Sequence, residues 1–210
     1  MKKLNFKKIA FIGNSKKFIF EFNSFFRYTL RSIIPWRKVQ YFHLKKKIIY
    51  NLIFICGYDF GSYHIDYRLF EKNNITYPFK FIKKISNKKT ILVYINTQNY
   101  KSGNYTFSRY KYAKQKLSYL LYRNFKNLVV INSDLITTKK IMSVNSNNFS
   151  KLFFLIFIKL GFLKKVEIKK IFIEIRKKLE NKNYEKQMNI TGHLLFIPRT
   201  QFIDRFLRLF

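Results

Sequence analysis

The chain has 210 residues, 48% of them hydrophobic, and carries 43 Lys and Arg against 10 Asp and Glu, for a formal net charge of +33. This length suits one domain with sizeable additions or two small domains, and the apolar content is enough for a packed core. The single cysteine, Cys56, excludes an intramolecular disulfide framework and a thiolate zinc site, and the lack of an apolar run of about 18 residues argues against a membrane-spanning helix.

The positive charge is the dominant feature of the sequence. A compact body with this charge repels itself unless a polyanion neutralises it; nucleic acid is the first candidate, and an anionic lipid surface is a second that needs fewer cations. The excess of Lys, Asn, Ile, Phe and Tyr is typical of an AT-rich genome, and the start has neither a secretion signal nor an Arg- and Ser-rich presequence. We therefore expect a protein of the mitochondrial matrix that is encoded in the organelle.

The first half of the chain predicts an extension followed by two strands. Residues 1–47 mix basic and aromatic side chains with little periodicity, which indicates an N-terminal extension that orders on a partner. β-branched and aromatic residues over 48–56, bounded by glycines, predict a strand, and a similar run over 90–95 predicts a second. Residues 65–70 between them predict a short helix.

The second half predicts a helix, a strand and a further extension. Apolar residues at helical spacing predict an amphipathic helix over 113–125, and 128–131 reads as a buried strand. Alternating strands and helices indicate a domain over residues 48–133 in which helices pack on a sheet. Residues 134–210 are expected to form a basic C-terminal extension, with helices at 149–160 and 166–181 and a short strand at 193–198.

Catalytic motifs are weak. The sequence has no phosphate-binding glycine fingerprint, no Gly-x-Ser-x-Gly elbow and no His pair at metal-ligand spacing. Asp59, His64 and Asp66 form a local cluster, but such residues in a glycine-containing loop more often shape turns than bind a metal. We therefore expect no enzyme activity, no metal, no cofactor and no small-molecule substrate.

The mixture of cations and aromatics predicts an RNA-binding surface, because cations neutralise phosphates and aromatic rings stack on unpaired bases. Residues 83–111 would form the two arms of a basic hairpin, although a solvated hairpin in a protein complex is an alternative. The residues expected to contact RNA are Lys83, Lys84, Lys88, Lys89, Lys101, Ser102, Arg109, Lys111, Arg37 and Lys38.

Short motifs between residues 48 and 133 occur in a recognisable order. The strand Leu52 to Ile55 leads to Tyr58-Asp59, Lys88 to Val93 is followed by Lys101-Ser102, and Phe107 and Arg109-Tyr110-Lys111 come next. This order resembles the small-subunit ribosomal protein ten family. The resemblance implies an α+β fold, a ferredoxin-like α/β sandwich with a long β-hairpin inserted in ribosomal RNA, plus basic N- and C-terminal extensions.

The resulting hypothesis is a structural constituent of the small subunit of an organellar ribosome, with ribosomal RNA and neighbouring ribosomal proteins as partners. Leu160-Gly161-Phe162-Leu163 is also similar to small-subunit ribosomal protein eight. A different alternative is an accessory subunit of an organellar membrane complex, such as a respiratory complex, which the aromatic content and the apolar run at 152–163 favour. Co-sedimentation with ribosomal RNA without detergent separates these alternatives.

Overall fold

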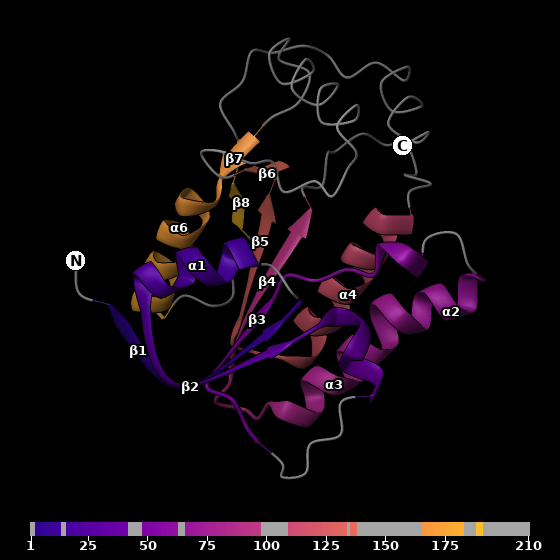
Figure 1. Ribbon diagram of the computed structural model, residues 1–210, viewed down its shortest axis with the longest axis horizontal. Coiled ribbons are helices and arrows are strands. Elements are labelled where there is room, and N and C mark those ends of the chain that lie inside the picture. The colour runs from indigo at the N-terminus through magenta and orange to yellow at the C-terminus, as the bar shows by residue number, and fades with distance from the viewer. Residues whose placement is uncertain are drawn as a thin grey trace.

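A computed structural model describes residues 3–13, 16–41, 48–62, 66–97, 109–133, 135–137, 165–182 and 188–190. Its centre is a sheet of six parallel strands in the order β2-β1-β3-β4-β5-β8 (Figure 1). The strands are β1 (Leu4–Ile12), β2 (Phe26–Ile34), β3 (Leu52–Ile55), β4 (Ile91–Thr97), β5 (Leu128–Ser133) and β8 (Met188–Ile190). Two further short strands, β6 (Leu135–Thr137) and β7 (Lys165–Glu167), pair with each other.

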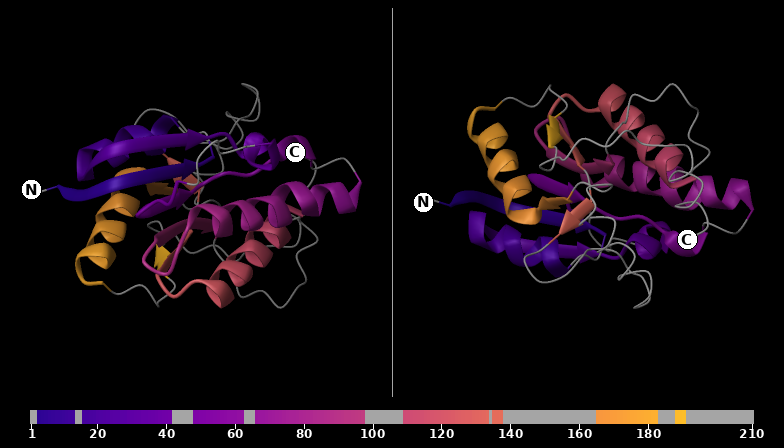
Figure 2. Two further views of the ribbon diagram at one scale, coloured as in Figure 1. Left: turned by 90° about the horizontal axis from the view of Figure 1, so that it is seen from below. Right: turned by 90° about the horizontal axis from the view of Figure 1, so that it is seen from above.

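Helices cover both faces of this sheet (Figures 1 and 2). One face carries α1 (Lys16–Phe25) and α6 (Ile168–Glu180), and the other carries α3 (Tyr77–Ile85) and α4 (Arg109–Asn124). The remaining elements are the short helix α2 (Tyr67–Glu71), the π-helical turn η3 (Lys72–Thr76), and the 3-10 turns η1 (Trp36–Tyr41) and η2 (Phe60–Ser62). Within the described residues, no helix has the length and apolarity that a membrane crossing requires.

The central strands are apolar on both faces because both faces are covered. Successive residues point to opposite sides, so Leu52 and Phe54 of β3 join the core beneath α1 and α6, whereas Ile53 and Ile55 join the core beneath α3 and α4. Strands β1, β4 and β5 divide their side chains in the same way. The short continuous apolar runs of the sequence are therefore the signature of a doubly covered parallel sheet.

The order of the strands reverses at β1. The chain passes from β1 through α1 to β2 on one side, and then crosses to β3 on the other side, so that β1 pairs in parallel with both. Ligands of open α/β sheets bind outside the carboxyl ends of the strands at such a reversal, because the two outgoing loops diverge there. This edge is where a functional site is expected.

Several predicted elements are confirmed, but the predicted fold class is wrong. The strands expected at 48–56, 90–95 and 128–131, the helices at 65–70 and 113–125, and the basic helix at 166–181 match β3, β4, β5, α2, α4 and α6. The sheet is wholly parallel and doubly covered, which excludes the ferredoxin-like sandwich. Residues 4–34 supply β1, α1 and β2 to the same sheet, which contradicts a fold class with a separate basic N-terminal extension.

The predicted basic hairpin is also wrong. Phe81, Ile82 and Ile85 recur at helical spacing and are buried, so Lys83 and Lys84 lie in the last turn of α3. Strand β4 pairs in parallel with β3 and β5, and parallel neighbours need crossovers rather than a tight turn. The strand pairings do not locate a domain boundary, so the predicted segment limits at residues 47 and 133 stay a prediction. The helix expected at 149–160 and the strand expected at 193–198 lie outside the described residues.

Candidate functional site

Two glycines meet where the strand order reverses. Gly13 ends β1 with φ +109°, and Gly57 follows β3 on the neighbouring strand. A Cβ on Gly13 would stand 2.5 Å from the backbone N of Gly57, so neither the conformation nor the spacing admits a side chain there. The carboxyl ends of β1 and β3 can therefore lie in direct backbone contact.

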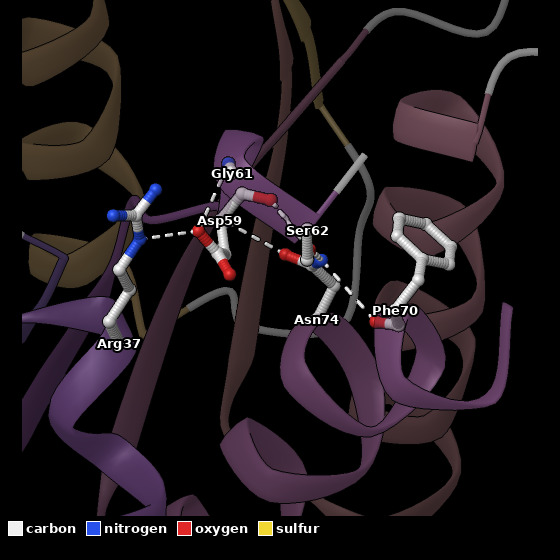
Figure 3. Close-up of polar contacts among 6 residues, drawn as sticks. All are labelled: Arg37, Asp59, Gly61, Ser62, Phe70 and Asn74. Carbon is white, nitrogen blue, oxygen red and sulfur yellow. Dashed lines mark hydrogen bonds and ion pairs between the residues drawn. The ribbon is translucent and has the colours of Figure 1, made fainter. Parts of the chain in front are cut away.

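The loop after β3 is fixed by a buried polar network (Figure 3). The side chain of Asn74 accepts a hydrogen bond from the Asp59 backbone N–H at 2.8 Å and donates to Ser62 Oγ at 2.6 Å. The Asp59 carboxylate accepts from Gly61 N at 3.1 Å and pairs with Arg37 Nε at 2.5 Å. Asn74 lies in the π-helical turn η3, a distortion that recurs at functional sites.

Lys114 lies buried beside this loop. It belongs to the apolar side of α4, is 5% exposed, and donates hydrogen bonds of 3.1 Å from Nζ to the carbonyl oxygens of Gly57 and Ile95. Its ammonium also stands 5.1 Å from the ring centroid of Tyr94. Burial lowers the pKa of Lys114 to about 8, and the nearby Cys56 thiol opposes that shift. The lysine thus ties the ends of β3 and β4 to α4 and titrates near neutrality.

Tyr110 lies one helical turn before Lys114 on α4, and residues four apart share a helix face. The Lys114 ammonium is 5.9 Å from the Tyr110 ring centroid, and the Tyr58 ring meets the Tyr110 ring edge-on at 4.7 Å. Burial raises the pKa of Tyr110 to about 12. At neutral pH the phenol is therefore protonated, and a lysine that is mainly charged lies beside it.

A phenol and an ammonium so placed can act on protons. The half-buried phenol can donate its proton to an oxygen that becomes basic during a reaction, and the neighbouring cation stabilises the phenolate that remains. A proton donor beside a cation of this kind favours acid–base chemistry. The chemistry suits a carbonyl or hydroxyl oxygen.

Aromatic and charged side chains flank the pair at the start of α4. The Arg109 guanidinium lies over the rings of Tyr67 and Phe70, at 5.7 and 5.5 Å from their centroids. The Tyr112 hydroxyl donates to Glu71 Oε1 at 2.6 Å, and the hydrogen bonds to Glu71 and Tyr67 raise the pKa of Tyr112. These contacts fix the first turn of α4 against α2.

The residues predicted to contact RNA are scattered over the fold. Arg37 and Lys38 lie in η1, Lys83 and Lys84 end α3, and Lys88 and Lys89 lie between α3 and β4. Arg109 and Lys111 begin α4, whereas Lys101 and Ser102 lie outside the described residues. The structure brings Arg37 and Arg109 to the carboxyl edge of the sheet but joins none of them into a hairpin arm.

Asp59 and Asp66 act as the turn residues that the sequence indicates. Asp59 binds its own loop and Arg37, and Asp66 caps α2 by accepting from the backbone N–H groups of Arg68 and Leu69. His64 lies outside the described residues. In the part of the chain that the structure describes, no three His, Cys, Asp or Glu side chains group as metal ligands would.

Sequence reasoning missed Tyr110 and Lys114. Lys114 lies within the amphipathic helix predicted at 113–125, three and seven residues before Leu117 and Leu121, and this spacing places it on the apolar face. A lysine on that face, one turn after a tyrosine, is the signal that could have found the pair. Gly13 directly after the apolar run 9–12 was a second unused signal, because it ends a strand before a helix.

The doubly wound parallel sheet with its reversal at β1 defines a Rossmann-like α/β fold. Solved structures match it over most of the chain. A dTDP-4-dehydrorhamnose reductase from Bacillus anthracis in complex with NADP has 13% identity and a TM-score of 0.61, covering 91% of this chain and 75% of that one.

Two further structures give the same result. The Clostridium acetobutylicum dTDP-4-dehydrorhamnose reductase has 15% identity and a TM-score of 0.59, with 88% and 74% coverage of the two chains. The Bacillus cereus UDP-N-acetylglucosamine 4-epimerase has 13% identity and a TM-score of 0.56, with 90% and 81% coverage. The sequence matches no protein-family model and no curated protein.

These findings overturn the ribosomal hypothesis. A Rossmann-like sheet is not the fold of the ribosomal protein ten family, so that resemblance, the small-subunit function and the ribosomal RNA partner are wrong. The alternatives of ribosomal protein eight and a membrane-complex subunit find no support in the fold either. The exclusion of an enzyme and of a small-molecule substrate is likewise wrong as argued, because the solved structures with this fold include reductases and an epimerase.

The residues present fit a dinucleotide at one end of the crevice. Gly13 supplies the tight turn after β1, and α1 directs its N-terminal N–H groups to the same edge, as pyrophosphate binding requires. After β2 stands Arg37, a cation suited to a 2′-phosphate. In the sequence, Ser15 and Phe18 occupy the positions of the second and third glycines of the fingerprint, and Phe18 is a core residue.

The adenosine end fits less well. A Cβ on Gly57 would stand 2.1 Å from Cε3 of Trp36, so the cradle that this glycine opens is filled by the chain's own indole. Arg37 is held by Asp59 in the same region. Two consecutive residues of η1 thus contact the loop that follows β3.

Proposed function

We propose that the chain is an NAD(P)-dependent enzyme of the reductase or epimerase type, acting on a carbonyl or hydroxyl group of a sugar nucleotide. The proposal is supported by the Rossmann-like fold and by the nature of the proteins that share it. Those likenesses are too distant to transfer an activity, so the residues at the carboxyl edge carry the argument.

The single observation that carries the proposal is the pair of Tyr110, which is half-buried, and Lys114, which is buried at the carboxyl ends of β3 and β4. Burying an ammonium costs free energy unless it is compensated, and two carbonyl oxygens and an aromatic ring compensate this one only in part, since the pKa falls to about 8. A position that served stability alone would be better filled by an apolar side chain. The cost is explained if Lys114 serves chemistry at the edge.

The roles follow from the charges. Tyr110 is the proton donor to the substrate oxygen, because its pKa of about 12 keeps it protonated at neutral pH. Lys114 stabilises the phenolate and fixes α4 against the ends of β3 and β4. Asn74 and Asp59 are positioning residues, since they hold the loop that carries Gly57 and Tyr58. A bound nicotinamide would supply or accept the hydride.

The test measures dinucleotide-dependent turnover of two probes. NADPH with dTDP-4-dehydrorhamnose tests reduction, and NAD⁺ with UDP-N-acetylglucosamine tests epimerisation. The variant Tyr110→Phe should lower kcat by roughly 100- to 10,000-fold while leaving dinucleotide affinity unchanged, because it removes only the transferable proton. Lys114→Met should lower kcat as well. The matched controls are Tyr119→Phe and Lys116→Met, both exposed on the same helix.

Two results contradict the proposal. One is the absence of dinucleotide-dependent turnover with both probes. The other is turnover that Tyr110→Phe leaves unchanged, which would separate any activity from the pair. A location in the mitochondrial matrix stays a prediction from composition and is independent of this test.

A further inference from the structure

Trp36 lies across the carboxyl ends of β1 and β3. It follows β2 directly after Pro35, yet its indole reaches Gly57, whose hypothetical Cβ would stand 2.1 Å from Cε3 and 2.7 Å from Cδ2. The same Cβ would stand 3.0 Å from Cα of Gly13. The indole therefore rests on Gly57, which itself packs against Gly13 where the strand order reverses.

That position is the one that a purine would take. In a doubly wound sheet the pyrophosphate lies at the helix N-terminus after the first strand, and the adenosine ribose lies at the end of the second. An adenine at this edge would need a place where the backbone is open to a flat ring, and glycine supplies one. In this chain the flat ring that approaches Gly57 is Trp36.

The indole is not fully satisfied where it lies. Trp36 is 7% exposed, and its Nε1–H is buried with no hydrogen-bond partner among the described residues. An unmade hydrogen bond at a buried donor costs about 1 to 3 kcal/mol, which offsets part of the gain from burying the ring. The missing hydrogen bond therefore reduces the free-energy difference that favours the buried position of the indole over a solvent-exposed one.

The neighbouring contact is also one that can be released. Arg37 pairs with Asp59 Oδ1 at 2.5 Å, and the Arg37 side chain is 69% exposed whereas that of Asp59 is 8% exposed. A ligand can therefore reach the guanidinium from solvent, while the buried carboxylate keeps its hydrogen bond from Gly61 N. A phosphate can replace the carboxylate as the partner of this guanidinium with bidentate geometry. Both residues lie in η1, a 3-10 turn, whose hydrogen-bond geometry is poorer than that of an α-helix.

We propose that Trp36 gates the adenosine end of the site: a dinucleotide binds only when the indole leaves Gly57 and Arg37 exchanges Asp59 for a phosphate of the ligand. This inference rests on the proposed function, because it concerns the same crevice. The gate lowers the affinity for a dinucleotide by the fraction of molecules in which it is open. It has no effect on a ligand that lacks the adenosine half.

The experiment uses Trp36 as its own reporter, because it is the single tryptophan of the full chain. Titration with NADP⁺ should shift the indole emission to longer wavelength and increase its quenching by acrylamide, because the ring moves from a buried to an exposed position. Nicotinamide mononucleotide, which lacks the adenosine half, should bind without either change. Calorimetry supplies the affinities independently of fluorescence.

Variants then test the cost of the gate. Trp36→Ala should bind NADP⁺ about tenfold or more tightly than the wild type, because the closed state no longer competes. Its affinity for nicotinamide mononucleotide should be unchanged. Lys38→Ala, an exposed cation in the same turn, is the control and should match the wild type. Circular dichroism verifies that each variant is folded, and the emission shift of the wild type decides the question if Trp36→Ala is not.

Each outcome bears on the inference. NADP⁺ binding that leaves the emission and quenching of Trp36 unchanged overturns the gate, and so does a folded Trp36→Ala with unaltered NADP⁺ affinity; in both cases the proposed function stands. If neither the wild type nor the variant binds NADP⁺, NAD⁺ or nicotinamide mononucleotide, the proposed function fails and the gate fails with it.

Discussion

At the scale of single residues, Lys114 shows how this chain handles a buried cation. Its ammonium donates to two backbone carbonyls and stands over the Tyr94 ring, and the Tyr94 hydroxyl donates in turn to the Lys114 carbonyl at 3.0 Å. Burial raises the pKa of Tyr94 well above its ordinary value, so this phenol remains a donor throughout the working range. Lys114 and Tyr94 thus contact each other twice, through the ammonium over the ring and through the hydroxyl that donates to the Lys114 carbonyl.

The lowered pKa of Lys114 makes stability depend on pH. Between about 8 and 10.5 the unfolded chain binds a proton that the folded chain has released, so the free energy of unfolding rises with pH across this window. Relative to Lys114→Met, the wild type should gain on the order of 3 kcal/mol between neutral pH and the top of the window. Urea unfolding at several pH values measures it. Lys116→Met, an exposed control that keeps Lys114, should show the same rise as the wild type, and the prediction is contradicted if Lys114→Met shows that rise too.

At the scale of elements, an aromatic cluster joins α1 and α6 to the sheet. Phe172 of α6 stacks on Phe54 of β3 at 5.5 Å and on Phe25 at the end of α1 at 6.0 Å. It also meets Phe18 and Phe22 edge-on. The N-terminal aromatics are therefore core residues that join strands distant in sequence to a helix near the C-terminus.

Truncating Phe172 tests this cluster. Phe172→Ala removes a fully buried ring that several others contact, and such changes cost about 3 to 5 kcal/mol because a cavity is added to the lost burial. Thermal and urea unfolding measure the loss. Lys169→Ala, exposed on the same helix, should change stability by less than about 0.5 kcal/mol. A similarly small cost for Phe172→Ala would show that α6 does not anchor the sheet.

The same elements show what could be predicted from the sequence. Local patterns located β3, β4, β5, α2, α4 and α6, because period and composition are local properties. The partners of a strand are not local: nothing within residues 4–12 states that β1 lies between β2 and β3. The aromatics at 18–28 were assigned to an extension because their partner, Phe172, lies some 150 positions further along the chain.

The site was hidden for a related reason. Tyr110 and Lys114 are meaningful only together with Gly57 and Ile95, which three separate elements bring to one edge. The chain has 33 Lys and 15 Tyr residues. A tyrosine and a lysine four positions apart are therefore not distinctive in this sequence, although they would be in one of ordinary composition. The glycine fingerprint did not indicate a dinucleotide-binding fold either, because Gly13 is its only glycine present in the sequence.

At the scale of the whole molecule, the folded state must tolerate the repulsion that arises from a large positive net charge. The described residues contain three ion pairs: Arg37–Asp59, Arg176–Glu180 and Lys177–Glu174. Against a formal charge of +33, these neutralise little. Net charge far from zero destabilises a compact state through self-repulsion. The fold must therefore be stable in spite of its surface charge.

Salt should consequently stabilise this protein. The screening length falls from about 30 Å at 0.01 M to about 8 Å at 0.15 M salt, so repulsion across the molecule is largely removed over this range. Each 1 kcal/mol of relief raises Tm by about 2 to 4 °C for a chain of this size. A variant in which Lys83, Lys84, Lys88 and Lys89 become Gln should have a higher Tm at low salt and a smaller rise with sodium chloride, because these exposed lysines contribute repulsion. The matched variant with Arg at the same four positions keeps the charge and should respond as the wild type does. If Tm instead falls with salt, the three ion pairs outweigh the repulsion and the net charge is not the destabilising force.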